Sequence, residues 1–597
     1  MLSLRRLQRF QWRPLVRLCS AELVHKDTFI EKLRNSYIED ERNNFVVPTF
    51  KKAMLFPDEI AIKDLNGEFT YFQLYITAKK LAIQISNFCG SASQSNVAFL
   101  CSTNALWVVI QWGCWISGQV AVPLEPNQAA DELLSQATDC KAKLLIGTPE
   151  CETITQELAT KLQTASIVLD HSFVPTSESV ASTAMYAKQL VGLNGALIPE
   201  STLPNDYYAN APAMLIYTPS SSNSRNGVVL THRNIEAQMR CLVASWHLKA
   251  SDSMLPLISM NRMHAAIGAL LGVGGNILLQ QKFDSHTAWS SLLGINSPSK
   301  QRVNIFLAMP IIYKRLIAEY DKMFAQDSRM VEYIINHCKQ KIRLMATAFG
   351  LLPESVFYRW REITGQNIYE YYGMLETGLV LGPALDEQSA NSSADYRPGT
   401  LGAPLIGVTA RLVNNQGDQL VSCKSEPSTE NSASSDQKPK SMPVLNTVVG
   451  ELEIAGANLF PRRINAMMQI TPVKVGSTAA VDQVAPMEHS AEKFLKTGDI
   501  CAYRNGSFIF LSKTTDVFNV GGYRVYGSEI KKALISHPSI NDVAVLGIPN
   551  KLWGHRLGVI CILSPDADVD LETIKSYCYS QLPAHKRPTV FKTIVAK

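Results

Sequence analysis

The sequence predicts an α/β protein built on parallel sheets with flanking helices, followed by a small α+β unit. Short apolar runs alternate with longer helical patterns through the middle of the chain, which is typical of parallel strands joined by crossover helices. Beyond Asp499 the pattern changes to strands around one short helix. With 597 residues, the chain is long enough for more than one domain.

The individual elements follow from apolar runs of strand length and from helical periodicity. Buried strands are predicted at Asn96–Cys101, Lys143–Ile146, Ala213–Tyr217, Val303–Met309 and Ile342–Ala346. Helices are predicted between them at Phe72–Phe88, Ala105–Ser117 and Ala129–Thr138. In the C-terminal unit, strands are predicted at Ser507–Leu511, Asp542–Ile548 and Leu557–Leu563, and a helix at Ser528–Ser536. Two stretches break the pattern: Ser422–Pro443, a predicted disordered loop rich in Ser, Lys, Glu and Pro, and Pro472–Ala491.

Composition excludes several classes of protein. A hydrophobic content of 46% with 18% charged residues indicates a soluble globular protein. The net charge of +5 is small for this length, so nucleic acid is not an expected partner. We find no uninterrupted apolar stretch of about 18 residues, so no membrane span is expected. The 12 cysteines form no CxxC pair and no zinc-type cluster, which favours reduced, buried thiols.

The N-terminal segment differs from the rest. Met1–Ser20 contains five arginines, and no acidic residue occurs before Glu22. An amphipathic, Arg-rich and acid-poor start is typical of a mitochondrial transit peptide. Because Pro14 interrupts a helix, the amphipathic part is expected at Leu2–Trp12. Residues 1–20 are thus predicted to direct the protein to the mitochondrial matrix, the alternative being an ordinary basic tail.

A hydroxyl-rich loop follows the predicted strand at Ala213–Tyr217. The segment Tyr217–Val228 contains Thr218 and the run Ser220, Ser221 and Ser222, whose hydroxyls and backbone N–H groups suit a phosphate. Pro219 has no N–H, however, and the loop has no lysine. A degraded nucleotide site and a serine-rich loop without function both remain open.

Several local patterns occur in a fixed order that resembles one superfamily. They are Tyr217–Val228, Tyr372–Gly378 (YGMLETG), Gly450–Leu452 (GEL), Lys496–Asp499 (KTGD) and Gly521–Arg524 (GGYR). Together they resemble the adenylate-forming enzymes: acyl-CoA synthetases, luciferases and peptide-synthetase adenylation domains. Long runs at 97–124, 363–383, 397–408 and 537–556 are similar to the mitochondrial malonyl-CoA synthetases of that superfamily. The resemblance extends from about residue 46 to the end.

The resemblance implies a fold and an activity. It implies a large domain at 46–499 with a β-barrel-like subdomain, and a small mobile α+β domain at 503–597. The implied reaction is an acid–thiol ligation in mitochondrial fatty-acid metabolism. A carboxylate of the malonate or methylmalonate type attacks the α-phosphate of ATP, and CoA then displaces AMP from the acyl-adenylate. ATP and CoA are the implied substrates and Mg²⁺ the implied cofactor.

The resemblance also assigns roles around the nucleotide. Glu376 is expected to hold Mg²⁺ against the phosphates, since a hard cation prefers oxygen ligands. Tyr372 is expected to stack on adenine, with Gly373 allowing close backbone approach. Asp499 is expected to accept both ribose hydroxyls. Thr218 and the three serines would contact phosphate.

Other roles concern the carboxylate and CoA. Arg343 matches a family arginine and is the candidate for the distal carboxylate of a dicarboxylate, with Arg262 as a second candidate. The Gly521–Gly522 turn would let CoA pass close to the backbone. A family arginine that contacts ATP phosphate is replaced here by Ser512 or by Lys513, depending on a shift of one residue; Lys513 would keep the catalytic charge.

Several positions depart from the family. Leu375 replaces a threonine, Ala348 and Phe349 replace a glycine and a serine, and histidines that border the acyl pocket are absent from 255–262. The family's C-terminal Gly-Lys segment has no counterpart before Lys597, so the small domain is expected to be truncated. Two hypotheses follow: an active acyl-CoA ligase, or a catalytically impaired pseudoenzyme that binds nucleotide, acyl-CoA or a partner protein.

Overall fold

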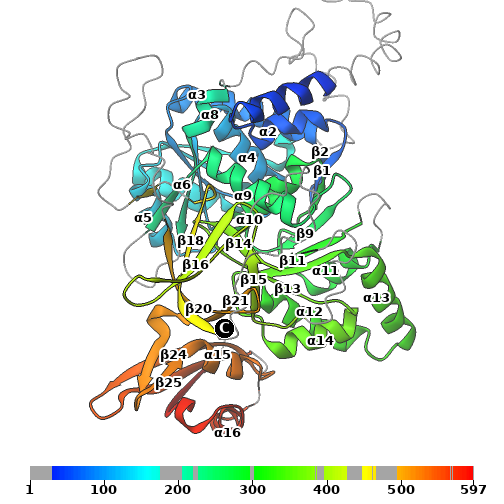
Figure 1. Cartoon of the computed structure of the whole chain (residues 1–597). Helices are drawn as coiled ribbons and strands as arrows, with labels where there is room; N and C mark the ends of the chain where they lie inside the picture. Colours follow the sequence, from blue (N-terminus) through cyan, green and yellow to red (C-terminus); the bar gives the residue numbers. More distant parts are fainter. Residues whose placement is uncertain are drawn as a thin grey trace, which may run out of the picture.

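Two large sheets and one small sheet form the framework of the molecule (Figure 1). The computed structural model describes residues 30–174, 203, 205–218, 226–295, 302–383, 385, 396–425, 447–459, 462–464, 494–564, 567 and 569–595. The predicted transit peptide at 1–20 and the stretch 472–491 therefore lie outside the described residues. A helix at 30–42 is the first described element.

The first sheet has seven strands in the order β19–β8–β7–β4–β3–β5–β6. The strands β7, β4, β3, β5 and β6 are parallel, whereas β8 and β19 add on antiparallel. Their bounds are β3 Asn96–Leu100, β4 Val120–Leu124, β5 Leu144–Gly147, β6 Ala165–Val168, β7 Pro212–Thr218, β8 Asn226–Thr231 and β19 Arg462–Ile464. Every residue of β3, β4 and β5 is buried, as expected for parallel strands covered on both faces.

The second sheet has fourteen strands, with a parallel part and an antiparallel part. The parallel part contains β1 Ile60–Asp64, β10 Asn276–Leu278, β9 Ser253–Leu257, β11 Ile305–Ala308, β12 Leu344–Ala348 and β13 Tyr369–Met374. The other strands are β2 Gly67–Thr70, β14 Gly378–Gly382, β15 Thr400–Pro404, β21 Ser507–Lys513, β20 Leu495–Arg504, β18 Val448–Gly456, β16 Val408–Val413 and β17 Gln419–Lys424. Because β15 contacts β16 and β17, the antiparallel part curls back on itself.

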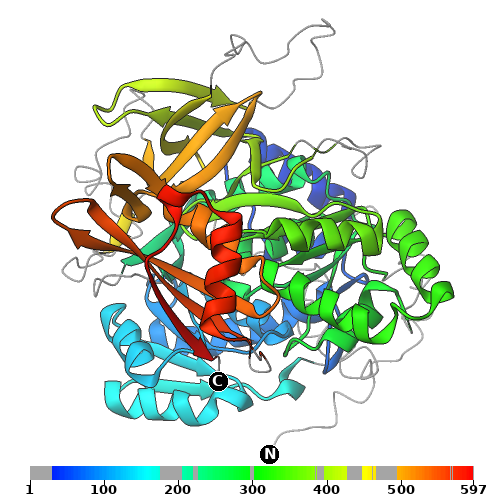
Figure 2. The same ribbon diagram turned by 90° about the horizontal axis from the view of Figure 1, so that it is seen from below.

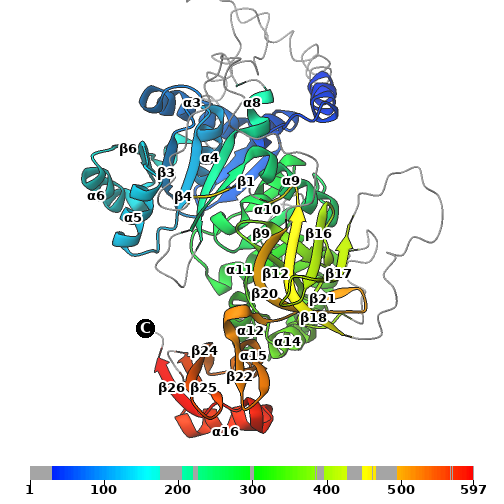
Figure 3. The ribbon, with the colours of Figure 1, turned by 60° about the vertical axis from the view of Figure 1, so that its left-hand side comes forward.

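Helices pack on these sheets and between them. They are α2 Thr49–Lys52, α3 Tyr71–Cys89, α4 Ala105–Ile116, α5 Ala130–Asp139, α6 Glu152–Leu162, α8 Asn205–Asn210, α9 His232–Ser245, α10 Met260–Gly272, α11 Ser285–Leu292, α12 Pro310–Met323, α13 Ser328–Lys341 and α14 Glu354–Thr364. The short 3₁₀ turns of this part are η2 Ala53–Leu55, η3 Pro149–Cys151 and η4 His171–Phe173. All residues of α4 are buried, because it contacts both β4 of the first sheet and β1 of the second (Figure 3).

The C-terminal part has its own sheet and core (Figures 1 and 2). It comprises η7 Thr514–Asp516, β22 Val517–Val520, β23 Tyr523–Tyr526, α15 Gly527–Ile535, β24 Ile540–Asn550, β25 Gly554–Leu563, α16 Leu571–Gln581, η8 Ala584–Lys586 and β26 Val590–Val595. At its contact with α12, Lys314 Nζ donates to the backbone oxygen of Ile540 at 2.6 Å.

The predicted elements agree with the structure within a few residues, but the strand predicted at Ser507–Leu511 belongs to β21 of the second large sheet and not to the C-terminal unit. The five predicted central strands correspond to β3, β5, β7, β11 and β12, and the three helices to α3, α4 and α5. The predicted loop at 422–443 needs a correction: residues 422–424 belong to β17 and pair with β16, whereas 426–446 lie outside the described residues. No helix among the described residues is long and apolar enough to cross a bilayer. The described cysteines are all unpaired, and all but Cys423 are buried.

Candidate active site

The YGMLETG segment forms a hairpin at the carboxyl end of the parallel strands. Tyr372 and Gly373 end β13, and Gly378 begins β14. A Cβ added to Gly373 would lie 2.1 Å from the backbone oxygen of Gly378, so the hairpin itself requires glycine there. The Thr377 hydroxyl accepts from the Met374 N–H at 3.1 Å and donates to the Gly378 oxygen at 2.8 Å, which fixes the turn.

Glu376 lies on this turn. It is 9% exposed, and its carboxylate makes no hydrogen bond or ion pair with any residue that the structure describes. The neighbouring Leu375, which replaces the family's threonine, packs against the main hydrophobic cluster. The turn therefore presents one carboxylate.

The two residues predicted to bind the nucleoside contact each other. Tyr372 Oη donates to Asp499 Oδ2 at 2.5 Å. Asp499 is 7% exposed, and this burial raises the pKa of its carboxyl, opposed by the hydrogen bond from Tyr372 and the charge of Lys513. One carboxylate oxygen thus accepts from the tyrosine, and the other accepts no hydrogen bond from the described side chains.

The register of β20 and β21 decides between Ser512 and Lys513. Lys513 lies opposite Asp499 and is exposed. Ser512 is fully buried, and its hydroxyl donates to the backbone oxygen of Asp516 at 3.1 Å. Only the lysine is therefore available to an anionic ligand beside Asp499.

The hydroxyl-rich loop is only partly placed. Thr218 ends β7 and Asn226 begins the antiparallel β8, so the loop joins these two strands as a hairpin. Ser220, Ser221 and Ser222 lie outside the described residues, as does the Thr218 side chain. The Tyr217 side chain is fixed by α5, because its hydroxyl donates to Asp139 Oδ2 at 2.7 Å.

Arg343 lies at the wrong edge of the sheet for its predicted role. It precedes β12, and its guanidinium donates to both oxygens of Asp252, at 2.8 and 2.5 Å, and to the Trp246 backbone oxygen at 2.8 Å. Asp252 and Arg343 both mark the amino ends of parallel strands. Ala348, at the carboxyl end of β12, is five residues away, or roughly 16 Å at about 3.3 Å per residue. The assignment of Arg343 to the substrate carboxylate is therefore corrected to a structural ion pair.

Arg262, by contrast, lies at the carboxyl edge. It follows β9 near the start of α10, and its guanidinium carbon is 5.8 Å from the ring of Phe349, which follows β12. Phe349 has a φ of 60°, a left-handed conformation that is strained for an aromatic residue. No hydrogen bond or ion pair joins the Arg262 guanidinium to another described residue. The neighbouring Asn261 donates to the Pro123 oxygen at 3.4 Å.

The Gly521–Gly522 turn borders a cavity in the C-terminal part. Gly521 and Gly522 have φ values of 58° and 86°, and a Cβ on Gly521 would lie 2.6 Å from the Trp553 ring. The cavity has a volume of about 580 Å³. Its charged and aromatic lining includes Tyr523, Trp553, His555, Arg556, His585 and Arg587.

Comparison with known proteins identifies the family. The chain matches the model of the AMP-binding enzymes over residues 49–461 and that of the AMP-binding enzyme C-terminal domain over residues 529–597. The chain belongs to the AMP-binding enzymes. It is thus an adenylate-forming enzyme of the acyl-CoA ligase type, which agrees with the resemblance in the sequence.

Several named proteins of this family are similar to the chain. The mitochondrial malonate–CoA ligase ACSF3 of Xenopus laevis is 31% identical, over 89% of this chain and 86% of the relative. The Homo sapiens protein of the same name is 29% identical, over 92% and 88%. Among solved structures, ATP-bound MatB from Rhodopseudomonas palustris has a TM-score of 0.66 at 20% identity, covering 92% of this chain and 95% of that one. This last likeness concerns the fold.

In this AMP-binding enzyme, Glu370 is a buried carboxylate that the sequence motifs did not single out. It lies on β13, two residues before Tyr372, and is 5% exposed. Its Oε1 accepts from the Gly399 N–H at 2.5 Å. Burial raises the pKa of Glu370 to about 7, opposed by that hydrogen bond and by the charge of Lys532 on α15.

We expect Glu370→Gln to change the pH dependence of stability. The pKa of Glu370 in the folded protein lies above its ordinary value, so the carboxyl favours folding below about pH 4.5 and loses this contribution as the pH rises through about 7. The neutral glutamine avoids that loss. The variant should therefore gain about 2–3 kcal/mol relative to wild type between pH 5 and pH 8 in urea denaturation. A difference that does not vary with pH would contradict the assignment.

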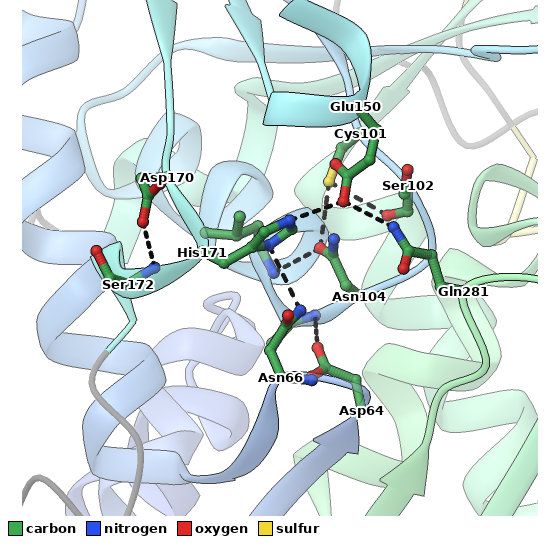
Figure 4. A network of polar contacts seen from close by, with 12 residues as sticks. Asp64, Asn66, Cys101, Ser102, Asn104, Glu150, Asp170, His171, Ser172 and Gln281 are labelled. Carbon is green, nitrogen blue, oxygen red and sulfur yellow. Dashed lines mark hydrogen bonds and ion pairs between the residues drawn. The ribbon is translucent and has the colours of Figure 1, made fainter.

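A second polar cluster joins the two large sheets (Figure 4). His171 Nε2 is 2.7 Å from Glu150 Oε1, which also accepts from Gln281 at 2.7 Å, and Asn66 lies 3.4 Å from His171 Nδ1. Although partial burial opposes it, these and backbone hydrogen bonds lower the pKa of Glu150. Within the described residues, no group of three metal-binding side chains is present here or elsewhere. The cluster connects loops after β3, β5 and β6 to the second sheet and has no link to the Tyr372–Asp499 pair.

Proposed function

We propose that this chain forms the CoA thioester of a short dicarboxylate, of the malonate or methylmalonate type, from ATP and CoA through an acyl-adenylate. The observation that supports this most is the Glu376 carboxylate, which has no partner among the described residues and lies on the same hairpin as Tyr372, the residue that donates to Asp499 of β20. A nucleotide phosphate chain needs neutralising cations, and Lys513 provides one beside Asp499.

The residues fit the Mg²⁺ ion that this chemistry requires. Glu376 is an oxygen ligand without a competing hydrogen bond among the described residues, as Mg²⁺ coordination demands. One carboxylate suffices, since Mg²⁺ in nucleotide sites takes its other ligands from water and phosphate. The bound ion would supply charge neutralisation to the phosphates, while Asp499 orients the ribose and Tyr372 the base.

The cavity beside Gly521 has the chemistry of the nucleotide end of CoA. Arg556 and Arg587 offer guanidinium groups suited to phosphates. Trp553 and the Tyr523–His585 ring pair, whose centroids are 4.8 Å apart, offer aromatic faces for adenine. We assign CoA to this surface, with its thiol arm passing over Gly522, where an added Cβ would meet no atom within 4 Å.

Domain limits and location complete the proposal. We assign residues 46–513 to the nucleotide-binding domain, because β21 pairs with β20 and β15 of the large sheet, and 514–597 to the mobile domain. Residues 1–20 are proposed as a mitochondrial matrix signal. Similarity to the mitochondrial malonate–CoA ligases of Xenopus laevis and Homo sapiens supports this location. The proposed role is in mitochondrial fatty-acid metabolism.

Two half-reactions test the function. The purified protein is assayed with ATP, Mg²⁺ and malonate or methylmalonate for pyrophosphate release, with acetate and propionate as matched monocarboxylates. Malonyl-adenylate and CoA are then supplied directly. Activity in neither step, with intact folding, would support the pseudoenzyme alternative, which Leu375 in the core and Phe349 beside Arg262 favour. Activity only in the second step would confine the defect to adenylation.

Arg262→Ala tests whether Arg262 binds the second carboxylate of a dicarboxylate substrate. We assign the distal carboxylate to Arg262, because its guanidinium lies at the carboxyl edge and forms no ion pair with any residue that the structure describes. Loss of a charge-assisted pair should raise KM for malonate about 10- to 100-fold and leave KM for propionate nearly unchanged. Arg329→Ala, on the exposed face of α13, is the control. Equal changes for both acids would show that Arg262 does not select the second carboxylate.

A further inference from the structure

His264 occupies an unusual hydrogen-bonding position on α10. Its ring is 3% exposed, and both ring nitrogens face oxygen atoms. Nδ1 is 3.0 Å from the backbone oxygen of Asn261, and Nε2 is 3.1 Å from Oε1 of Gln238 on α9. His264 lies outside the motifs identified in the sequence, and the proposed chemistry does not use it.

The orientation of the Gln238 amide is fixed from its other side. Gln238 Nε2 donates to the Asn458 backbone oxygen at 3.1 Å. Because a carbonyl oxygen only accepts, the amide nitrogen must face Asn458 and Oε1 must face the histidine ring. Gln238 is 1% exposed, so water offers no alternative partner.

This chain of hydrogen bonds ends at the turn that carries Glu376. Asn458 Nδ2 donates to the Thr377 backbone oxygen at 2.9 Å. Gln238 also packs against the start of β14, since a Cβ on Gly378 would lie 2.9 Å from its Cδ. The buried network therefore connects the start of α10, where Arg262 lies, to the Glu376 hairpin.

A neutral imidazole leaves this network incomplete. It has one N–H and one lone pair, whereas both of its neighbours here are acceptors. In one of the two contacts, the lone pair of the ring nitrogen then faces a lone pair of the oxygen. Only the imidazolium donates to both oxygens. Burial acts the other way and lowers the pKa of His264, with the Asn261 oxygen raising it. The net effect is a lowered pKa, so the neutral ring prevails at neutral pH and the imidazolium, which completes the network, forms on acidification.

We propose that His264 is a positioning residue that couples the acyl side of the site to the Glu376 turn, and that its protonation tightens this coupling. Its kinetic consequence rests on the proposed function, whereas the coupling itself does not. The charged groups on the helices around α10 are engaged elsewhere: Glu236 pairs with Arg240 at 3.0 Å and with Lys52 at 3.8 Å, and Lys51 donates to the Leu203 oxygen. Direct titration of His264 is therefore the expected source of the pH dependence.

The first test is independent of activity. Histidine side-chain NMR on the full chain is followed from pH 8 to pH 5, together with the backbone amides of Thr377 and Gly378. We expect the His264 ring to become doubly protonated and the two amides to shift with the same midpoint. In His264→Gln the amide shifts should disappear. A ring that stays neutral, or amides that do not follow it, would overturn the proposal.

The second test is kinetic. His264→Leu should raise KM for Mg·ATP about tenfold in adenylation, the usual effect of losing a residue that orients a ligand, and leave thioester formation from supplied acyl-adenylate unchanged. Wild-type KM should fall toward low pH, and His264→Gln should give an intermediate, pH-independent KM. The control His337→Leu removes a buried histidine of α13. Unchanged KM in His264→Leu would overturn the proposal, whereas an inactive wild type with coupled NMR shifts would refute only the ligase function.

Discussion

Arg343→Ala is expected to lower the free energy of unfolding by about 3–5 kcal/mol. The variant leaves the Asp252 carboxylate, which is 3% exposed, without the guanidinium that donates to both of its oxygens. Removing one partner of a buried ion pair has this effect because the remaining charge stays desolvated. Urea denaturation monitored by circular dichroism measures the loss.

A double variant separates this effect from a role in catalysis. Arg343→Ala with Asp252→Asn removes both charges and should recover part of the lost stability, since no bare carboxylate remains buried. Arg329→Ala, at an exposed position, should leave stability unchanged. A normally stable Arg343→Ala with a raised KM for malonate would restore the substrate role that the sequence resemblance implied.

Glu376→Gln is expected to slow adenylation about 100- to 1,000-fold. The amide keeps the size of the side chain but removes the carboxylate charge that we assign to Mg²⁺ binding. Pyrophosphate release measured against Mg²⁺ concentration should show a lower maximum and a higher half-saturating concentration.

Two comparisons make the Glu376 experiment specific. Thioester formation from supplied acyl-adenylate should be nearly unaffected, because that step involves no triphosphate. Glu354→Gln, at an exposed acid near the start of α14, should behave as wild type. If Glu376→Gln carried out adenylation at the wild-type rate, Glu376 would not be part of the active site.

Local sequence patterns predicted elements well and distant contacts poorly. Apolar runs located β3, β5 and β7, because burial on both faces leaves an unbroken hydrophobic signature. The polar run from residue 422 hid the end of β17, in which only Val421 and Cys423 pack against the core. Its edge position explains this, since an edge strand with one covered face tolerates polar residues.

For the site residues too, local motifs were predicted well and contacts between distant segments were not. Tyr372 and Asp499 are 127 positions apart, and their motifs identified both, but the hydrogen bond between them emerged only from the fold. Arg343 matched a motif, yet a linear match does not say at which end of a strand a side chain lies. The two partners of His264 are Asn261 on the same helix and Gln238 on α9, and Asn458 orients the Gln238 amide, so no spacing in the sequence indicates that both ring nitrogens face acceptors.

The burial of α4 has a consequence for how the molecule unfolds. Because this helix is apolar on every side and lies between β4 and β1, neither large sheet can separate from it without exposing a hydrophobic surface to water. Melting of the two sheets is therefore thermodynamically linked, and both belong to one cooperative unit. The C-terminal part has its own hydrophobic core, so its unfolding is not linked through α4 to that of the two large sheets.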